Sequence, residues 1–158
     1  MEIKYLEKLK NAPKIREQKT KGVKESEISK IENRLKIKFP LAYREFLLLA
    51  GKDHGGLQLA DGYTSIEMLA DERVLNNLKV SLKNANLKIE RPFWVISEQD
   101  SFEQFYFFYL DEDTEDPLVY GITYGSGDDS IIYSLHKSFS EFINSVIDKS
   151  ILFAKRGY

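Results

Sequence analysis

A proline at position 40 separates two stretches of helical periodicity, and this pattern constrains the fold more than any other part of the chain. Apolar residues recur at spacings of three and four on both sides of it: Ile28, Ile31 and Leu35 before, and Tyr43, Phe46, Leu47 and Ala50 after. A proline pushes the preceding residue out of the helical region and suits the first position of a new helix. The sequence therefore predicts two amphipathic helices over about 25–50, with Gly51 ending the second in a left-handed conformation.

From Pro92 onward, short runs of aromatic and β-branched residues alternate with turn-forming residues. They predict strands over 93–97, 104–110, 118–124 and 130–135. Their connections are short, so neighbouring strands should be antiparallel. Ser138 and Glu141 form an S-x-x-E capping box that predicts a last helix. With a further helix over about 65–79, this order predicts an α+β fold, in which helices pack on one side of an antiparallel sheet of about four strands.

The length of 158 residues favours a single domain, 1–158, in which residues 1–23 form a short leading helix and a basic linker. There is no cysteine, which excludes disulfides and thiolate nucleophiles. The longest apolar run covers only residues 46–51, and the N-terminus has no apolar centre of the kind that a signal peptide needs. We therefore expect a cytoplasmic protein without a membrane span.

Charge is unevenly distributed along the chain, although the net charge is only −2. Residues 1–40 contain twelve Lys or Arg and six Asp or Glu, whereas residues 97–130 contain ten Asp or Glu and no Lys or Arg. The acidic residues are Glu98, Asp100, Glu103, Asp111, Glu112, Asp113, Glu115, Asp116, Asp128 and Asp129. We expect them to lie near one another, either as ordinary solvated turns or as a face that docks on a basic surface such as a nuclease cleft.

Five aromatic residues in a row, from Phe105 to Tyr109, make both faces of one predicted strand aromatic. One face should belong to the core, and the other should be covered by a helix or by a partner. Exposed tyrosines would supply the rigid anchors that dominate protein interfaces. The predicted partner-binding surface therefore adds Trp94 and Tyr124 to the ten acidic residues.

No reaction centre can be assembled from the sequence. It has no phosphate-binding loop and no recognisable nucleophile, and two histidines, His54 and His136, are too few for a structural zinc site. The acidic turn does not fit a calcium loop, because Asp116 and Ile122 stand where glycine and glutamate are required. We expect no enzyme activity, no cofactor and no metal, although ten clustered acids leave a glycosidase-type carboxylate pair open.

The basic N-terminal stretch is the one feature that favours nucleic-acid binding. Its lysines are not interleaved with aromatic residues, and the overall charge is acidic. A solvated linker explains the lysines more simply, so no nucleic-acid partner is expected. Glu32 stands among core positions of its helix, where we expect it to hold backbone N–H groups near the glycines rather than to catalyse a reaction.

The motif around Pro40 resembles the opening motif of the SUKH superfamily. Its residues are Glu27, Ile28, Glu32, Leu35, Phe39, Pro40, Tyr43, Phe46 and Leu47, followed by Gly51, Gly55 and Gly56. The resemblance continues in residues 93–96, in the acidic turn before Pro117, and in residues 138–143. It implies that Glu32, Phe39, Pro40, Tyr43, Phe46, Gly51, Gly55 and Gly56 have a structural role.

SUKH proteins include bacterial toxin-immunity proteins and relatives of yeast cell-wall-synthesis regulators. The resemblance thus implies a non-enzymatic protein-binding module, an immunity protein that neutralises a cognate toxin. The acidic residues, and not the resemblance, favour a toxin with a basic active-site cleft, a nuclease being one such class. The alternative is a regulatory scaffold that binds an endogenous client. The sequence leaves the oligomeric state open.

Overall fold

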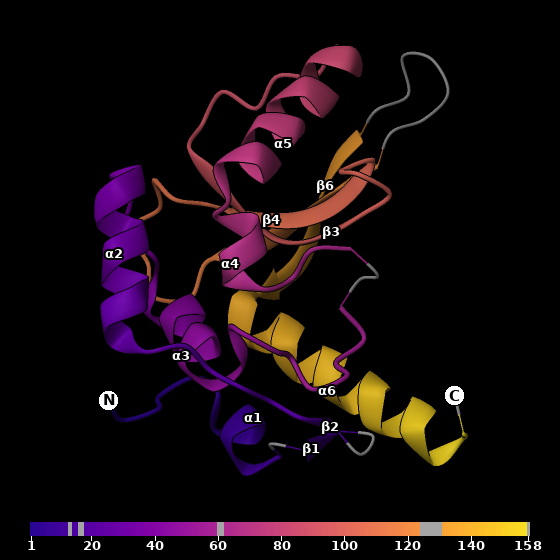
Figure 1. Ribbon diagram of the computed structural model, residues 1–158. Coiled ribbons are helices and arrows are strands. Elements are labelled where there is room, and N and C mark those ends of the chain that lie inside the picture. Colours follow the sequence, from indigo (N-terminus) through magenta and orange to yellow (C-terminus); the bar gives the residue numbers. More distant parts are fainter. Residues whose placement is uncertain (13, 16–17, 60–61, 124–130, 158) are drawn as a thin grey trace.

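The computed structural model describes residues 1–12, 14–15, 18–59, 62–123 and 131–157 (Figure 1). Its helices are α1 (Glu7–Asn11), α2 (Glu25–Leu35), α3 (Leu41–Ala50), α4 (Ile66–Leu69), α5 (Glu72–Asn84) and α6 (Phe139–Lys155). Its strands are β1 (Lys14–Ile15), β2 (Gln18–Lys19), β3 (Phe93–Gln99), β4 (Gln104–Tyr109), β5 (Leu118–Thr123) and β6 (Ile131–Ser138). Strands β3 to β6 form an antiparallel sheet in chain order, and β1 pairs with β2. The predicted α+β fold is confirmed.

The two helices on either side of Pro40 are present as predicted. The residues at their ends, however, differ in position or conformation from the prediction. Pro40 is the extended N-cap of α3, one residue before its first helical position. Gly51 is right-handed, with φ −66° and ψ −22°, because it continues the helical backbone and donates to the Leu47 carbonyl at 3.0 Å. The left-handed prediction for Gly51 is therefore wrong. The left-handed residue is Lys36, at φ 56° and ψ 43°, which ends α2.

Replacing Lys36 by glycine is expected to raise the free energy of unfolding by about 1 kcal/mol. A side chain in the left-handed region is strained by its Cβ, and glycine is not. Lys30, exposed in the middle of α2, is the matched control, because its replacement by glycine should instead lower stability by about 1 kcal/mol. Urea unfolding of both variants measures the two changes, and changes of equal sign would contradict the assignment.

Two other parts of the chain differ from the sequence prediction. The helix expected over 65–79 is divided into α4 and α5, because Asp71 caps a new helix by accepting the Arg73 N–H at 2.8 Å. Ser65 caps α4 by accepting the Met68 N–H at 3.4 Å. The basic linker contains the short β1–β2 pair, which the sequence analysis did not predict because no alternation of apolar and polar residues marks these strands.

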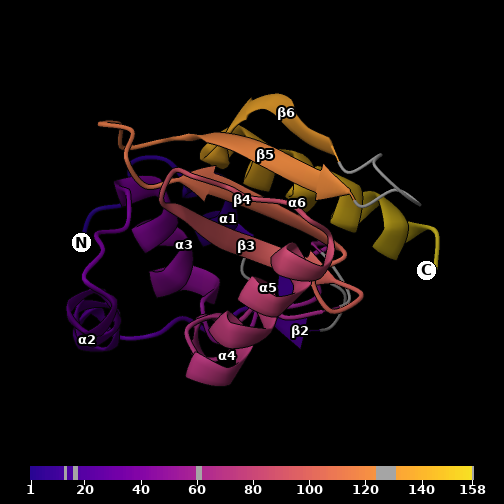
Figure 2. The same ribbon diagram turned by 90° about the horizontal axis from the view of Figure 1, so that it is seen from above.

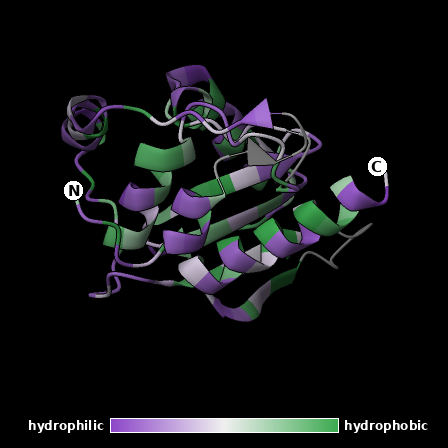
Figure 3. Ribbon diagram, turned by 90° about the horizontal axis from the view of Figure 1, so that it is seen from below, coloured by the Kyte–Doolittle hydropathy of each residue, from purple (hydrophilic) through white to green (hydrophobic). Residues whose placement is uncertain are grey.

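One face of the sheet packs on α3 and α6 (Figure 1). Phe108 of β4 contacts the rings of Tyr43 in α3 and Phe139 in α6, with centroids 5.3 and 6.1 Å apart. Tyr106 contacts Phe142 in the next turn of α6. In Figure 3, which is seen from below, apolar and polar residues alternate along α6. This amphipathic pattern lets one side of the helix enter the core while the other stays polar.

The opposite face of β4 is also aromatic, as predicted from the five consecutive aromatic residues. Phe107 is fully buried among rings that include Phe93, Tyr109 and Tyr120. Helices α4 and α5 lie beside β3 (Figure 2), and their side chains meet those of β3 around a small cavity. The ribbons of β5 and β6 lie away from these two helices.

Candidate functional site

The described acidic residues in the turns of the predicted surface lie in two places instead of one. Consecutive strands of the meander run in opposite directions, so the β3–β4 turn and the β4–β5 turn lie at opposite ends of the sheet. The length of β4 separates these turns by roughly 20 Å. Asp100 and Glu103 belong to the first turn, and Asp111, Glu112, Asp113, Glu115 and Asp116 belong to the second.

Two residues of the predicted surface are buried. Trp94 is 5% exposed, and its Nε1 donates to the hydroxyl of Tyr43 at 2.9 Å. Glu98 is 3% exposed, and its carboxylate accepts the backbone N–H groups of Tyr63 and Phe102 at 2.7 and 3.0 Å. Both side chains shape the fold and are not accessible to a partner. Tyr124, Asp128 and Asp129 lie outside the described residues.

Residues 110–117, which join β4 to β5, are called the acidic loop below. Arg91 binds one end of this loop through two hydrogen bonds to Asp111, at 2.7 and 3.0 Å. The same guanidinium lies over the ring of Tyr109, 3.8 Å from its centre. The hydrogen bonds from Arg91 lower the pKa of the Asp111 carboxyl, so this group stays ionised. Arg91 therefore neutralises part of the loop and fixes Asp111, its first acidic residue.

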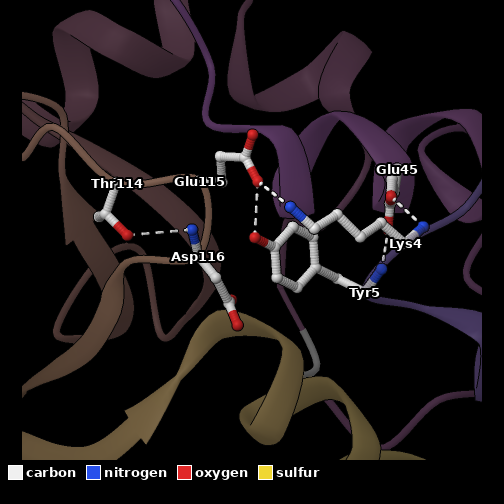
Figure 4. A network of polar contacts seen from close by, with 6 residues as sticks. All are labelled: Lys4, Tyr5, Glu45, Thr114, Glu115 and Asp116. Atoms are coloured by element: carbon white, nitrogen blue, oxygen red, sulfur yellow. Dashed lines mark hydrogen bonds and ion pairs between the residues drawn. The ribbon is translucent and has the colours of Figure 1, made fainter.

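The other end of the acidic loop is bound to the N-terminal segment (Figure 4). Glu115 Oε2 accepts hydrogen bonds from Lys4 Nζ at 2.7 Å and from the Tyr5 hydroxyl at 2.6 Å. Both hydrogen bonds lower the pKa of the Glu115 carboxyl, and the one from Lys4 has the larger effect. The Glu115 carbonyl also accepts the N–H of Ala42 in α3. The loop is thus connected to two segments that are distant in the sequence.

Asp116 joins the acidic loop to the start of α6. Its carboxylate accepts the backbone N–H of Ser140 at 2.8 Å and the Ser140 hydroxyl at 2.6 Å. Its own N–H donates to Thr114 Oγ1 at 3.3 Å (Figure 4). A carboxylate in this position satisfies helix N-terminal donors and interacts favourably with the helix dipole. Asp116 is therefore a structural residue of the loop.

Asp113 and Glu112 are the acids of the loop that remain least engaged. Asp113 is exposed, and no described residue forms a hydrogen bond or an ion pair with it. Glu112 is half-buried and approaches the Arg91 guanidinium only at 3.5 Å. These two carboxylates are therefore the least neutralised negative groups of the loop.

A groove of about 530 Å³ lies between the acidic loop and the corner at Pro40. The corner contributes Phe39, Pro40 and Leu41, and the loop contributes Glu112, Asp113 and Glu115. The corner side also carries two cations, the exposed Lys38 and Arg44, which is hydrogen-bonded to Glu32. One wall therefore combines apolar residues with cations, and the other carries carboxylates. Such a groove can hold a protein segment whose aliphatic stem lies on the apolar residues and whose cationic end faces the acids.

Glu32 fixes the shape of the corner. Its Oε2 accepts the Phe39 N–H at 2.7 Å, and its Oε1 is hydrogen-bonded to Arg44 of α3. The sequence led us to expect that Glu32 would hold backbone N–H groups near the glycines, but the N–H that it accepts belongs to Phe39 at the corner and not to the glycine loop, residues 51–56. Charge-assisted hydrogen bonds of this kind hold α2 and α3 in one arrangement.

The other residues of the predicted structural motif form the core or the glycine loop. Phe39, Tyr43 and Phe46 are buried, and the Phe39 ring lies 4.9 Å from that of Trp94. Gly55 and Gly56 have φ angles of 65° and 84°, which disfavour other residues. The buried aromatic rings thus hold the corner in place, and the positive φ angles of Gly55 and Gly56 determine the shape of the glycine loop.

His54, within the glycine loop, has a pKa lowered by burial. Its Nδ1 is buried, and no described group forms a hydrogen bond with it. The unfolded chain binds the proton more readily than the folded chain does, so the free energy of unfolding should fall as pH decreases from about 7 to about 5. The loss should be smaller in His54→Gln. Urea unfolding at both pH values tests this, and equal pH dependence in the two proteins would contradict it.

Sequence reasoning missed Glu45, which is fully buried in α3. Its carboxylate accepts the backbone N–H groups of Lys4, Tyr5 and Leu6 at 2.6, 2.9 and 3.0 Å. Figure 4 shows the first two contacts beside those of Glu115. The available clue was a carboxylate inside the apolar run of α3. Glu45 therefore docks the N-terminal segment, which in turn holds the acidic loop.

The described residues contain no group of three or more potential metal ligands of the His, Cys, Asp or Glu type. Within the same residues, no helix combines the length and the apolar character that crossing a membrane requires.

Comparison with known families identifies one match. The model of the SMI1 / KNR4 family (SUKH-1) matches residues 22–145. This range includes the corner, the groove and the acidic loop, whereas Lys4, Tyr5 and the rest of the N-terminal segment precede it. A comparison with curated proteins gives no match.

Proposed function

Because the chain belongs to the SMI1 / KNR4 family (SUKH-1), we propose that it is a non-enzymatic protein-binding module, an immunity protein that neutralises a cognate toxin by direct association. The groove between the acidic loop and the Pro40 corner carries this proposal, because it places the apolar residues Pro40 and Leu41 opposite accessible carboxylates. The proposal regards residues 1–158 as one domain that acts in the cytoplasm.

The contact surface in this proposal is narrower than the one predicted from sequence. It is centred on Glu112 and Asp113, with Pro40 and Leu41 as the apolar residues of the facing wall. Asp111, Glu115 and Asp116 support the loop through their bonds to other segments. Asp100 and Glu103, at the other end of the sheet, are left outside the surface.

The chemistry of this surface favours a basic partner. Carboxylates on a rigid loop attract a positively charged surface over several ångströms and accelerate its association, and salt weakens this effect. A toxin whose active site binds phosphate groups presents such a basic cleft. A nuclease is therefore the toxin class that fits the groove best.

Affinity capture tests the proposal. The tagged chain is incubated with lysate of its source organism, and the bound proteins are identified by mass spectrometry after washes of increasing salt. One stoichiometric basic protein with toxin activity, released by salt, is the expected result. Several unrelated endogenous proteins, or a partner that salt does not release, would contradict the proposed mode of binding.

The second candidate function is a regulatory scaffold that binds an endogenous client. It is favoured by the same family, whose description joins SUKH-1 proteins with SMI1 / KNR4. Deleting the gene separates the two functions. An immunity protein should be dispensable when the toxin is absent, whereas loss of a regulator should change growth or morphology without any toxin.

A further inference from the structure

The two edges of the sheet differ in how they are covered. Along the outer side of β3, Gly62 donates to the Glu98 carbonyl at 3.0 Å, and Glu98 donates to the Tyr63 carbonyl at 3.1 Å. These bonds cover that edge at Glu98. At the other edge, no described strand pairs with the outer side of β6. An uncovered edge offers a row of backbone donors and acceptors to another strand.

The exposed part of β6 is apolar and uncharged. Ile131, Ile132 and Tyr133 are 60%, 36% and 40% exposed, and residues 131–135 contain no charged side chain. Proteins normally protect an edge strand with lysine, proline or a bulge. Here such features occur only at the end of the strand, where His136 has a φ of 55° and Lys137 follows it. The unprotected segment is therefore 131–135.

We propose that residues 131–135 of β6 pair with the same segment of a second copy of this chain. The two strands run antiparallel around a two-fold axis at Tyr133 and join the two four-stranded sheets into one. This register places Ile131 opposite Leu135 and Ile132 opposite Ser134. Each exposed isoleucine thus loses contact with water, which provides the apolar driving force.

Charge selects a second copy as the occupant of this edge. A self-pairing strand must avoid placing like charges opposite each other, and the segment 131–135 has no charge to repel. Lys137 lies beyond the paired segment, so the two copies of this lysine do not face each other. A basic toxin would find no carboxylate along 131–135, in contrast to the acidic loop. The dimer is therefore independent of the proposed toxin site.

Sedimentation equilibrium of the full chain, from low micromolar to submillimolar concentration, tests the pairing. The mass is expected to rise from that of one chain toward that of two. Ile131→Lys places a charge on the edge at a largely exposed position and should weaken self-association about ten-fold or more. Val80→Lys, on the exposed side of α5, is the matched control and should leave the dimer unchanged.

Single cysteines provide a second measurement, because the chain contains none. Oxidation of Tyr133→Cys should give a disulfide-linked dimer, since this residue meets itself at the two-fold axis, whereas Val80→Cys should remain a monomer. Circular dichroism establishes that each variant is folded. A monomer at every concentration, a dimer that Ile131→Lys leaves intact, or equal cross-linking of the two cysteine variants would overturn the proposal. A monomer at every concentration would mean that a different protein, and not a second copy of this chain, pairs with this edge.

Discussion

Replacing Glu45 by alanine is expected to lower the free energy of unfolding by about 4 kcal/mol. The fully buried carboxylate accepts the backbone N–H groups of Lys4, Tyr5 and Leu6. Alanine leaves these donors without their acceptor, and a buried donor without a partner loses its hydration as well as its bond. Urea unfolding measures the change.

Glu7→Ala is the control for this prediction. Glu7 lies on the exposed side of α1, and its carboxylate is 3.9 Å from Lys10 Nζ. Exposed ion pairs contribute little, so this variant should lose less than about 0.5 kcal/mol. A change below about 1 kcal/mol in Glu45→Ala would show that the N-terminal segment is not held by this carboxylate.

Reversing the charge of Asp113 is expected to slow association with the partner about ten-fold at low salt. Asp113 is exposed on the groove wall and is bound by no described side chain, so Asp113→Lys should leave the fold intact. Its effect should fall mainly on the association rate, because a charge at the rim acts during diffusional encounter. Stopped-flow mixing with the captured partner at several salt concentrations measures it.

Glu103→Lys is the matched control, since it changes the net charge equally from an exposed turn at the opposite end of the sheet. It should leave the association rate within about two-fold of the wild-type rate. Equal slowing by the two variants would mean that net charge, and not the acidic loop, attracts the partner. Two unchanged rates would remove the acids from the mechanism.

Periodicity and capping residues were sufficient to predict most of the fold. The helices around Pro40 and the strands after Pro92 have strong local patterns, and Ser138 caps α6 as its S-x-x-E sequence indicates. The end of α2 was missed because a lysine, Lys36, occupies a conformation that glycine normally adopts. No single-residue preference predicts such a position, since the chain around it determines the conformation.

The candidate site was only partly predictable. The sequence shows which acidic residues the chain contains, but the path of the chain in the fold decides where each of them lies. Acidic residues that are close in the sequence lie at opposite ends of the sheet, as alternating strand directions require. Glu98 looks like its exposed neighbours in the sequence, yet backbone groups of Tyr63 and Phe102 surround it. Glu45 was missed for the same reason, since the donors that it binds precede it by about 40 residues.

Hydrogen exchange of the chain, alone and with its captured partner, tests the central claim most directly. The claim is that the partner binds the groove between the acidic loop and the Pro40 corner. Binding is then expected to slow exchange in the segments 38–44 and 109–117, which contain the residues that line the groove, and to leave the β3–β4 turn unchanged. Protection confined to that turn or to β6, with none at the groove, would contradict the account.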